Sequence, residues 1–240
     1  MAAKKIAILG DGNGAHMMAA DFAMKGHQVS MYIYEAREEV RKLMETKTIN
    51  IEGVLKTSVK LHNVTCDIEE AIKEADYICI VTPAFVHAFY ANLLKGKVKK
   101  NQVIVTFPGA FAALQIKKVF GDDPECPVFA DVNNLPYDTR LSGPAKVNLF
   151  GRNAVNIAFL PASAGDSLID EMRVDLFPFE KVYRDVLECG LSIVNPAWHT
   201  GPCLLSVTSI ENPTNNFFVY EHGWTPSACK LNIVLDQERK

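Results

Sequence analysis

The residues best suited to chemistry lie within the first fifteen positions. Gly10-Asp11-Gly12-Asn13-Gly14-Ala15 follows an apolar run, Lys5–Leu9, and precedes a stretch of small residues typical of a helix. Gly10 permits a sharp turn out of a strand, and Gly12 has no side chain to keep a pyrophosphate away from the backbone. Ala15 occupies the close-packing position, and the free N–H groups at the helix start can bind phosphate. We therefore predict a dinucleotide site that uses Gly10, Gly12, Asn13, Gly14 and Ala15.

A second strand, expected over Gln28–Tyr34, leads into the acid Glu35. An acid at this position can bind a ribose 2′-OH and repel a 2′-phosphate, which favours NAD. Arg37, two residues later, can instead hold that phosphate, and an alanine at the third motif position is compatible with NADP. The sequence thus predicts NAD or NADP as cofactor and favours NAD slightly.

Strands and helices are expected to alternate from residue 1 to residue 188, which predicts a Rossmann-type, doubly wound α/β fold with a parallel sheet covered on both faces. The further strands are expected at Asp76–Val81, Gln102–Phe107 and Val128–Asp131, and the helices at Ala36–Thr46, Ile68–Ala75, Val86–Leu94, Phe111–Phe120 and Phe179–Glu188. Alternating apolar and polar residues over Thr48–Asp67 indicate a short β excursion. Two more strands are expected over Ala145–Phe159, turning at Gly151–Asn153. Residues 189–240 have a mostly helical pattern, and we interpret them as the start of an α-helical substrate domain that is cut off partway.

Ligands of doubly wound sheets bind outside the carboxyl ends of the strands. Loops at such ends contain Thr82, Pro83 and Ala84 after one strand and Pro108 with Gly109 after the next. We expect both loops to contact the nicotinamide half of the cofactor, although each can also be an ordinary turn. A third loop, Asp131–Tyr137, carries Asn133 and Asn134, which we predict as substrate contacts.

His199 differs from the other histidines in its setting. His16, His27, His62, His87 and His222 have simple explanations on helix surfaces, in caps or in loops. His199 lies four residues after Asn195, so the two share a face if the segment is helical. A dehydrogenase needs a group that exchanges a proton near neutral pH, and histidine is suited to that task. A purely structural role for His199 stays open on position alone.

Bulk composition excludes several classes of partner. The chain has 240 residues and a net charge of −3, from 25 basic and 28 acidic residues, so no basic field exists to attract nucleic acid. No apolar run reaches the length of a membrane span. Six cysteines are scattered without metal-type or redox spacing, which indicates reduced thiols. We expect a cytoplasmic protein with no metal site and with no nucleic-acid or membrane partner.

Several motifs, in order along the chain, resemble the opine dehydrogenases of the octopine/nopaline dehydrogenase family, over their N-terminal two-thirds. The motifs are Gly10–Ala15, Val81-Thr82-Pro83-Ala84 with His87, Leu135-Pro136-Tyr137 with Arg140, Asn195-Pro196-Ala197-Trp198-His199, Phe217–Tyr220, Gly223 with Thr225-Pro226-Ser227, and Leu235-Asp236 with Glu238-Arg239. Members of that family reductively condense an amino acid with a 2-oxo acid, often pyruvate, using NADH or NADPH.

The resemblance implies that His199 is the proton-transfer group and that Asn195 orients it or the nicotinamide. It also adds Arg140 to the predicted substrate contacts. Thr200 stands where a proline commonly follows the family histidine. The family's helical domain continues for roughly another hundred residues, which supply an acid and an arginine to the site. We therefore expect this chain alone to bind nucleotide with little opine-forming activity, unless a homodimer partner, Asn133 or Arg140 completes the site.

Two other functions remain open. Because a fold does not determine an activity, the chain can belong to a dehydrogenase of 2-hydroxy acids or sugar phosphates. It can also be a non-catalytic nucleotide-binding fragment. Dependence of NAD(P)H oxidation on an amine separates these alternatives from opine formation.

Overall fold

The computed structural model describes residues 2–214 and 216–240 of the chain. Its contacts divide at Gly190 into two compact units, Met1–Gly190 and Leu191–Lys240. We call them the first and the second unit and describe each by itself.

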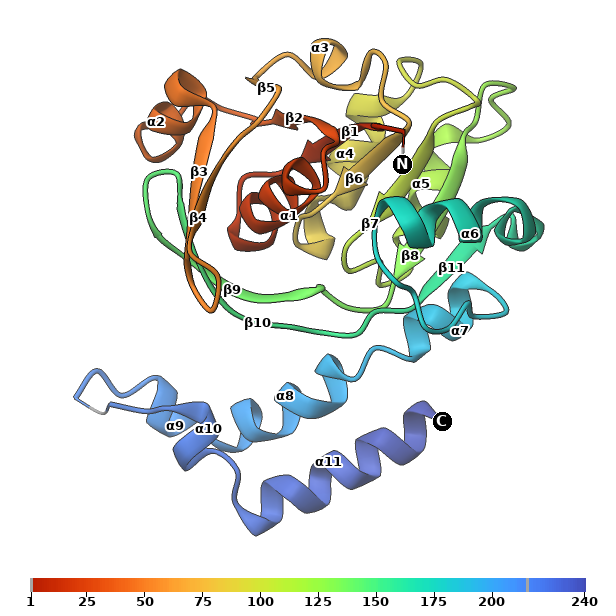
Figure 1. Cartoon of the computed structure of the whole chain (residues 1–240). Coiled ribbons are helices and arrows are strands. Elements are labelled where there is room, and N and C mark those ends of the chain that lie inside the picture. The colour runs from red at the N-terminus through yellow and green to blue at the C-terminus, as the bar shows by residue number, and fades with distance from the viewer. Residues whose placement is uncertain (1, 215) are drawn as a thin grey trace. The chain divides into compact units, whose positions relative to one another are not determined.

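A seven-stranded sheet with the order β11-β8-β7-β6-β1-β2-β5 forms the centre of the first unit (Figure 1). Its strands are β1 (Lys5–Leu9), β2 (Gln28–Tyr32), β5 (Asn63–Thr65), β6 (Tyr77–Ile80), β7 (Val103–Thr106), β8 (Val128–Val132) and β11 (Ile157–Leu160). Neighbouring strands are parallel except β11, which runs antiparallel to β8 at the edge. Every residue of β6 and β7 is buried, as expected for apolar strands covered on both faces. The predicted α/β fold is therefore confirmed, and the strand order reverses at β1.

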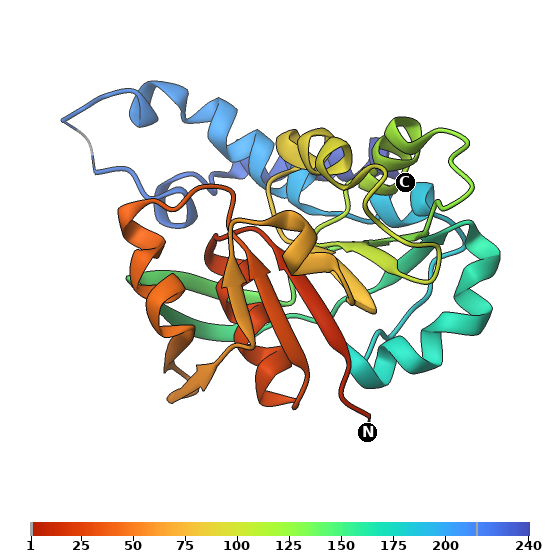
Figure 2. The ribbon, with the colours of Figure 1, turned by 90° about the horizontal axis from the view of Figure 1, so that it is seen from above.

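Helices cover both faces of this sheet and form two hydrophobic cores. One core joins the sheet to α1 (Asn13–Met24), α2 (Glu38–Thr46) and α6 (Gly165–Asp175). The other core joins it to α3 (Ile68–Ile72), α4 (His87–Leu94), α5 (Ala112–Phe120) and α7 (Val186–Leu191). The view from above shows α4 and α5 together on one face (Figure 2). The sheet is thus closed on its two faces and open to ligands at its strand ends.

A second sheet, with the order β4-β3-β10-β9, packs against α1. Its strands are β3 (Thr48–Gly53), β4 (Thr57–Lys60), β9 (Tyr137–Gly143) and β10 (Lys146–Arg152). Because α1 lies between the two sheets, every residue from Gly14 to Phe22 is buried. A helix buried all round has small and apolar residues on all its sides, and this explains the composition of α1.

A buried carboxylate joins α1 to the second sheet. Asp21 accepts hydrogen bonds from the Tyr137 hydroxyl at 2.8 Å and from the Arg152 guanidinium at 2.6 and 3.2 Å. Burial alone would raise the pKa of Asp21, but the bonds from Arg152 and Tyr137 and the charge of Lys25 bring it below its ordinary value. Asp21 is therefore ionised and paired at neutral pH.

Two expectations about the second half of the first unit are wrong. The two strands expected over Ala145–Phe159 are present as β10 and β11. The turn expected at Gly151–Asn153 is wrong, because β10 continues to Arg152 and the two strands pair with other partners, β10 with β9 and β3, and β11 with β8. The strand β9 was not expected, because exposed polar residues such as Asp138 and Arg140 alternate along it and resemble a loop.

The second wrong expectation is the helix over Phe179–Glu188. Residues 179–185 are not helical, Val182 forms a parallel bridge with Ile157, and a helix begins only at Val186. The Lys181 N–H donates to the side-chain oxygen of Asn156 at 2.8 Å, so this segment bonds to the edge of the sheet instead of to itself. The helix α6, before it, was not expected either.

The second unit is helical, as predicted for the residues after Gly190. It contains α8 (Asn195–Leu205), α9 (Val207–Ile210), α10 (Val219–His222) and α11 (Pro226–Arg239). Thr225 caps α11 by accepting the Ala228 N–H at 3.3 Å, and Pro226 occupies the first helical position. α8 packs against α11, and the rings of Trp198 and Trp224 lie 4.5 Å apart. Within residues 2–214 and 216–240, no helix is long and apolar enough to cross a membrane.

Candidate functional site

The turn after β1 requires glycine at Gly10 for two reasons. Its φ is +125°, a conformation that residues with a side chain rarely adopt. A Cβ atom there would also lie 2.6 Å from the Val81 carbonyl oxygen. Its N–H donates to the Tyr32 carbonyl at 3.2 Å. Gly10 therefore lets the chain turn sharply between β2 and β6, at the point where the strand order reverses.

Gly12 differs from Gly10, because nothing in the protein requires its missing side chain. It is the N-cap of α1 with an ordinary extended backbone, and no protein atom lies within 4 Å of the position its Cβ would take. No side chain caps α1, and the first N–H groups of a helix have no partner within the helix. Together with the positive end of the helix dipole, these groups suit an anion. The empty space at Gly12 thus fits the pyrophosphate of a dinucleotide.

The next three residues of the motif fasten the turn to the rest of the first unit. Asn13 accepts the Leu141 N–H of β9 at 2.8 Å through its side-chain oxygen. A Cβ at Gly14 would approach Leu135 to 2.8 Å, and Ala15 is fully buried. Asn13 and Ala15 thus anchor the turn through a hydrogen bond and through packing, and Gly14 leaves room for Leu135.

A cleft of about 510 Å³ lies at the carboxyl ends of β1, β2 and β6. It is lined by Gly10, Asp11, Gly12, Tyr34, Val81, Thr82, Pro83, Val86, Phe89 and Tyr90. The predicted contacts Thr82 and Pro83 thus lie in it, and Ala84 follows them as the exposed first residue of a 3₁₀ turn, Ala84–Val86. The cleft starts at the glycine turn, as a dinucleotide site must.

Aromatic rings form one wall of this cleft and were missed by sequence reasoning. The Tyr34 ring meets Phe89 edge to face at 5.0 Å, and Phe89 meets Tyr90 at 5.3 Å. Tyr34 and Phe89 are exposed although they are large and apolar. Aromatic faces stack well on a purine. The available signal was an aromatic residue just beyond a strand end at Tyr34, next to the predicted acid Glu35.

Arg37 pairs with Asp11 of the glycine turn. The hydrogen bond that Arg37 donates to Asp11 and the negative charge of Asp11 raise the pKa of Arg37, so the guanidinium is firmly charged. Glu35 is exposed, and its carbonyl accepts the Arg37 N–H at 2.8 Å. The two residues that were expected to distinguish NAD from NADP therefore lie side by side, with Arg37 already engaged by a carboxylate.

The loop after β7 is held by Asp131, a residue that we did not single out from the sequence. Asp131 is fully buried and accepts hydrogen bonds from the Thr106 hydroxyl at 2.5 Å and from the Ala113 N–H at 3.0 Å. Burial raises its pKa to about 6, against the opposing effect of these bonds. A Cβ at Gly109 would lie 2.4 Å from the Cβ of Asp131. Position 109 therefore requires glycine, because the Cβ of any other residue would collide with Asp131.

This loop also contains strained backbone. Ala110 and Phe111, which follow Gly109, have φ values of +48° and +67°, which is unusual for residues with side chains. The Gly109 N–H donates to the Val132 carbonyl at 2.7 Å, and Asp131 binds the first turn of α5 just beyond the strained pair. Asp131 therefore fixes the predicted contacts Pro108 and Gly109. An acid within an otherwise apolar strand was the signal that could have identified it.

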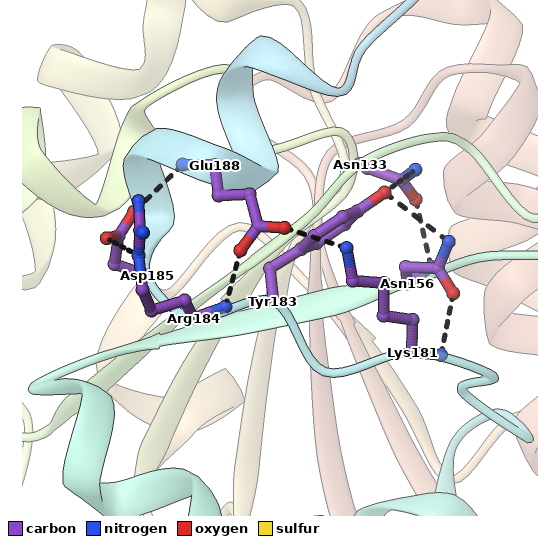
Figure 3. Close-up of polar contacts among 7 residues, drawn as sticks. All are labelled: Asn133, Asn156, Lys181, Tyr183, Arg184, Asp185 and Glu188. Atoms are coloured by element: carbon purple, nitrogen blue, oxygen red, sulfur yellow. Dashed lines mark hydrogen bonds and ion pairs between the residues drawn. The ribbon is translucent and has the colours of Figure 1, made fainter.

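Asn133 belongs to a polar network at the end of β8 (Figure 3). Its side-chain oxygen accepts the Asn156 N–H at 2.9 Å, and its amide donates to the Tyr183 hydroxyl at 3.3 Å. Lys181 lies 4.4 Å above the Tyr183 ring and pairs with Glu188 at 2.7 Å. The network ties the segment before α7 to the carboxyl edge of the sheet, so Asn133 has a structural role in addition to the predicted one.

The other two predicted substrate contacts lie apart from this network. The Asn134 side chain accepts the N–H of Leu135 at 2.9 Å, a bond within its own turn. Arg140 lies on β9 in the second sheet, where it is exposed and donates to the Thr139 carbonyl at 2.8 Å. The structure therefore does not gather Asn133, Asn134 and Arg140 around one point.

Three of the histidines that were expected on helix surfaces, in caps or in loops are in fact buried: His27, which follows α1, and two within helices. His16 lies within α1, and its Nδ1 is 3.1 Å from the Gly12 carbonyl oxygen. His87 lies at the start of α4, and in the described part of the chain neither of its ring nitrogens has a hydrogen-bond partner. Burial lowers the pKa of His16 and His87, so both are neutral at pH 7. The expectations for these two failed because α1 and α4 are covered on the sides that carry them.

The predicted catalytic residues lie in the second unit, one turn apart on α8. Asn195 is its first residue and is exposed, while His199 is half-buried. The His199 ring meets the Tyr220 ring of α10 at 5.8 Å and 78°. The shared face that was expected for Asn195 and His199 requires a helix, and α8 supplies it.

Comparison with known proteins shows which families the chain resembles. Residues 182–240 match the family model described as the NAD/NADP octopine/nopaline dehydrogenase alpha-helical domain. Residues 5–115 match the model for the N-terminus of NAD-dependent glycerol-3-phosphate dehydrogenase. An opine dehydrogenase of Arthrobacter sp. (strain 1C) is 31% identical over 241 residues, covering 98% of this chain and 66% of that protein. Octopine dehydrogenase of Pecten maximus is 27% identical, covering 80% of this chain and 53% of that protein.

Solved structures show the same fold. Octopine dehydrogenase in complex with NADH and agmatine superposes with a TM-score of 0.69 at 23% identity, covering 88% of this chain and 56% of that one. A ketopantoate reductase of the PanE/ApbA family from Ralstonia eutropha JMP134 superposes with a TM-score of 0.68 at 17% identity, covering 98% and 72%. The chain belongs to the opine/octopine dehydrogenase family, and it spans about two thirds or less of the length of the opine dehydrogenases described here.

Proposed function

We propose that this member of the opine dehydrogenase family takes part in the NAD(P)H-dependent condensation of an amino acid with a 2-oxo acid such as pyruvate. The observation that carries the proposal is the open glycine turn at the point of strand reversal, in a chain whose homology to an opine dehydrogenase extends into α8 and α11.

The residues of the first unit would bind the cofactor. The N–H groups at the start of α1, beside Gly12, would hold the pyrophosphate. Tyr34 and Phe89 would contact the adenine, and the loop that Asp131 fixes would contact the nicotinamide half. Bound in this way, the reduced nicotinamide would supply the hydride for the imine carbon.

His199 would move protons at the reacting nitrogen and oxygen. Its neutral imidazole can take a proton from the amino acid's ammonium group, which frees the nitrogen lone pair to attack the carbonyl carbon of the oxo acid. The protonated imidazole can then return that proton to the hydroxyl that leaves as water when the imine forms. Asn195, one turn earlier on α8, would orient the ring or the substrate.

We also propose a preference for NAD over NADP. Arg37 is bound by Asp11, so a 2′-phosphate would have to compete with a carboxylate that already holds the guanidinium. Glu35, exposed beside it, adds a second negative charge. Side-by-side titrations with NADH and NADPH test this preference, and tenfold tighter binding of NADPH would refute it.

Two further proposals concern the oligomeric state and the cellular location of the protein. A homodimer is proposed as one way to complete the substrate site. A cytoplasmic location is proposed from the scattered cysteines, of which Cys79 is buried inside β6.

The decisive assay measures NADH oxidation with pyruvate and a panel of amino acids, each omitted in turn. Opine formation requires both substrates. Oxidation of NADH by an oxo acid or a sugar phosphate without an amine would indicate the alternative dehydrogenase, to which the match at residues 5–115 gives some support. Nucleotide binding without turnover would indicate the non-catalytic alternative.

The role of His199 has its own test. Where turnover is measurable, His199→Ala should lower it by about 10²–10⁴ and leave the NADH dissociation constant unchanged. His62→Ala, at an exposed surface position, is the matched control and should lower neither. Unchanged turnover in His199→Ala would refute the role proposed for the imidazole.

A further inference from the structure

A proline interrupts the hydrogen bonding of α8 directly after the predicted catalytic turn. Pro202 lies inside the helix and has no N–H. In a regular helix that N–H would donate to the carbonyl four residues earlier, which is that of Trp198. The Trp198 carbonyl therefore lacks its normal helical donor one residue before His199.

A side chain from α11 supplies the missing donor. The Asn232 amide donates to the Trp198 carbonyl oxygen at 2.9 Å, and only 9% of Asn232 is exposed. The amide must face this way, because the opposite orientation would place two acceptor oxygens against each other. A side chain of one helix thus replaces the backbone donor that the other helix lacks.

Gly201 makes room for this contact. A Cβ at Gly201 would lie 2.4 Å from the Asn232 side-chain oxygen and 3.3 Å from Leu231. Gly201 and Pro202 are the buried residues of α8, so the helix has a notch into which Asn232 fits. Within residues 2–214 and 216–240, the Asn232 side-chain oxygen has no hydrogen-bond partner. The bond to Trp198 therefore determines how the amide is held.

The same turn carries His199. Trp198 directly precedes it, so Asn232 holds the backbone from which the imidazole projects. The Tyr220 ring contacts the imidazole itself. Asn232 fixes the main chain at this turn, and Tyr220 limits the rotation of the imidazole. Together they restrict the direction of the His199 side chain.

We propose that Asn232 is a positioning residue for His199, because it substitutes for the helical donor that Pro202 lacks. The proposal rests on the proton-transfer role proposed above for His199. Its structural part makes a prediction that does not need turnover: Asn232 matters only as long as residue 202 is proline.

A double-mutant cycle on the full chain tests that dependence. The chain has two tryptophans, and both Trp198 and Trp224 lie in the second unit, so tryptophan fluorescence during urea unfolding reports on this unit. Asn232→Leu should lower the ratio of folded to unfolded second unit roughly tenfold or more, since the Trp198 carbonyl loses its donor. In the Pro202→Ala background the new N–H binds that carbonyl, and the same substitution should lower the ratio less than about threefold.

Two further variants keep the test decisive. Gln237→Leu makes the same amide-to-leucine change at an exposed position of α11 and should leave the midpoint unchanged. Gly201→Ala would normally stabilise a helix, but here it should destabilise the second unit, because its Cβ displaces Asn232. Equal effects of Asn232→Leu in both backgrounds would overturn the proposal.

A spectroscopic measurement separates positioning from plain stability. The His199 ring protons, assigned with His199→Gln, should show a ring-current shift from Tyr220 in the NMR spectrum. Asn232→Leu should change that shift and the pH midpoint of the ring signals, and Pro202→Ala in the same chain should restore them. Unchanged His199 signals in Asn232→Leu would refute positioning even if stability falls. If His199→Ala instead kept full turnover, the proposed function would fail while the coupling between Asn232 and Pro202 stood.

Discussion

Replacing Gly12 by alanine should strongly weaken nucleotide binding and leave the fold intact. The added methyl group meets no protein atom within 4 Å, and the backbone of Gly12, with φ of −81°, suits alanine. The loss of stability without ligand should therefore stay below about 1 kcal/mol, the cost of a less favourable N-cap. With ligand, the methyl group occupies the space that the pyrophosphate would take.

The expected loss of affinity follows from the contacts at the helix start. Each hydrogen bond from a backbone N–H to a charged phosphate contributes about 1.5–3 kcal/mol. Weakening two of them would cost about 2–4 kcal/mol, which raises the NADH dissociation constant roughly 30- to 1,000-fold. The variant should thus bind NADH only at concentrations far above those that saturate the natural chain.

Thermal unfolding with and without NADH measures both effects in one experiment. At a concentration 100 times the dissociation constant, a ligand stabilises its protein by about 2.7 kcal/mol. For a unit of this size that is roughly 5–10 °C in Tm. At the same NADH concentration the shift in Gly12→Ala should fall below about 3 °C, and calorimetric titration should give the same change in affinity.

Gly10→Ala is the matched control, because it changes the same type of residue two positions earlier. Its φ of +125° and the 2.6 Å approach of a Cβ to the Val81 carbonyl predict a fall in Tm without any ligand, from about 2–3 kcal/mol of strain. If Gly12→Ala bound NADH normally, the pyrophosphate would not lie at this turn. A fall in ligand-free Tm as large as that of Gly10→Ala would show that the space at Gly12 is not open.

Three further predictions follow from buried polar groups and from the aromatic wall. The pKa of Asp131 is raised to about 6 from 3.8, so the stability gained by holding its proton is complete below about pH 3.8 and is lost as the pH rises through about 6. Asp131→Asn should therefore gain stability relative to the natural chain between pH 4 and 7. Urea midpoints of the two proteins that change in parallel over that range would contradict this. The pKa of Asp21 is lowered, so its contribution is present above pH 3.8 and is lost as the pH falls further, and Asp21→Asn should cost about 1–2 kcal/mol at pH 7 and little in strong acid, as measured by urea unfolding. Phe89→Ala should weaken binding of NADH and of AMP by a similar factor, roughly 5- to 30-fold, since a stacking contact contributes about 1–2 kcal/mol; an effect on NADH alone would place the adenine elsewhere.

The dinucleotide turn could be predicted from the sequence because its requirements are local. Gly10 must adopt a backbone conformation that other residues avoid, and this need is visible in the residue type itself. The space that Gly12 leaves for a pyrophosphate stays a prediction. The parallel sheet was predictable for the same reason, since β6 and β7 are short, mostly apolar runs between helical segments.

Elements that depend on distant partners could not be predicted in this way. Phe179, Val182 and Val186 have helical spacing, yet the bridge between Val182 and Ile157 holds this segment at the sheet edge, and residues 179–185 form no helix. One sheet contact outweighs the local periodicity here. The strand β9 escaped notice for a related reason, because its register comes from β10 and one of its faces is exposed.

In the candidate site, too, local features were predictable from the sequence and contacts with distant residues were not. Asn133 and Asn134 were predicted as substrate contacts because a loop has little need for two amides. In the structure Asn133 has a structural role, because its side-chain oxygen accepts the Asn156 N–H and its amide donates to the Tyr183 hydroxyl. Asn156 is 23 positions away, and no pattern within the loop could indicate that bond. A role for Asn133 toward substrate stays a prediction.

Two buried polar residues of this chain instead correspond to irregularities in the backbone. Asp131 binds the first turn of α5 where two left-handed residues precede it, and Asn232 binds the carbonyl that Pro202 leaves without a donor. In both places the backbone departs from regular structure beside a predicted catalytic or cofactor contact. A side chain from a distant element then forms the hydrogen bond that the backbone N–H or carbonyl group lacks. An unsatisfied buried group costs about 1–3 kcal/mol, which exceeds most surface interactions. Asn232 should therefore tolerate the loss of its amide only together with a change at Pro202, and the double-mutant cycle measures that dependence directly.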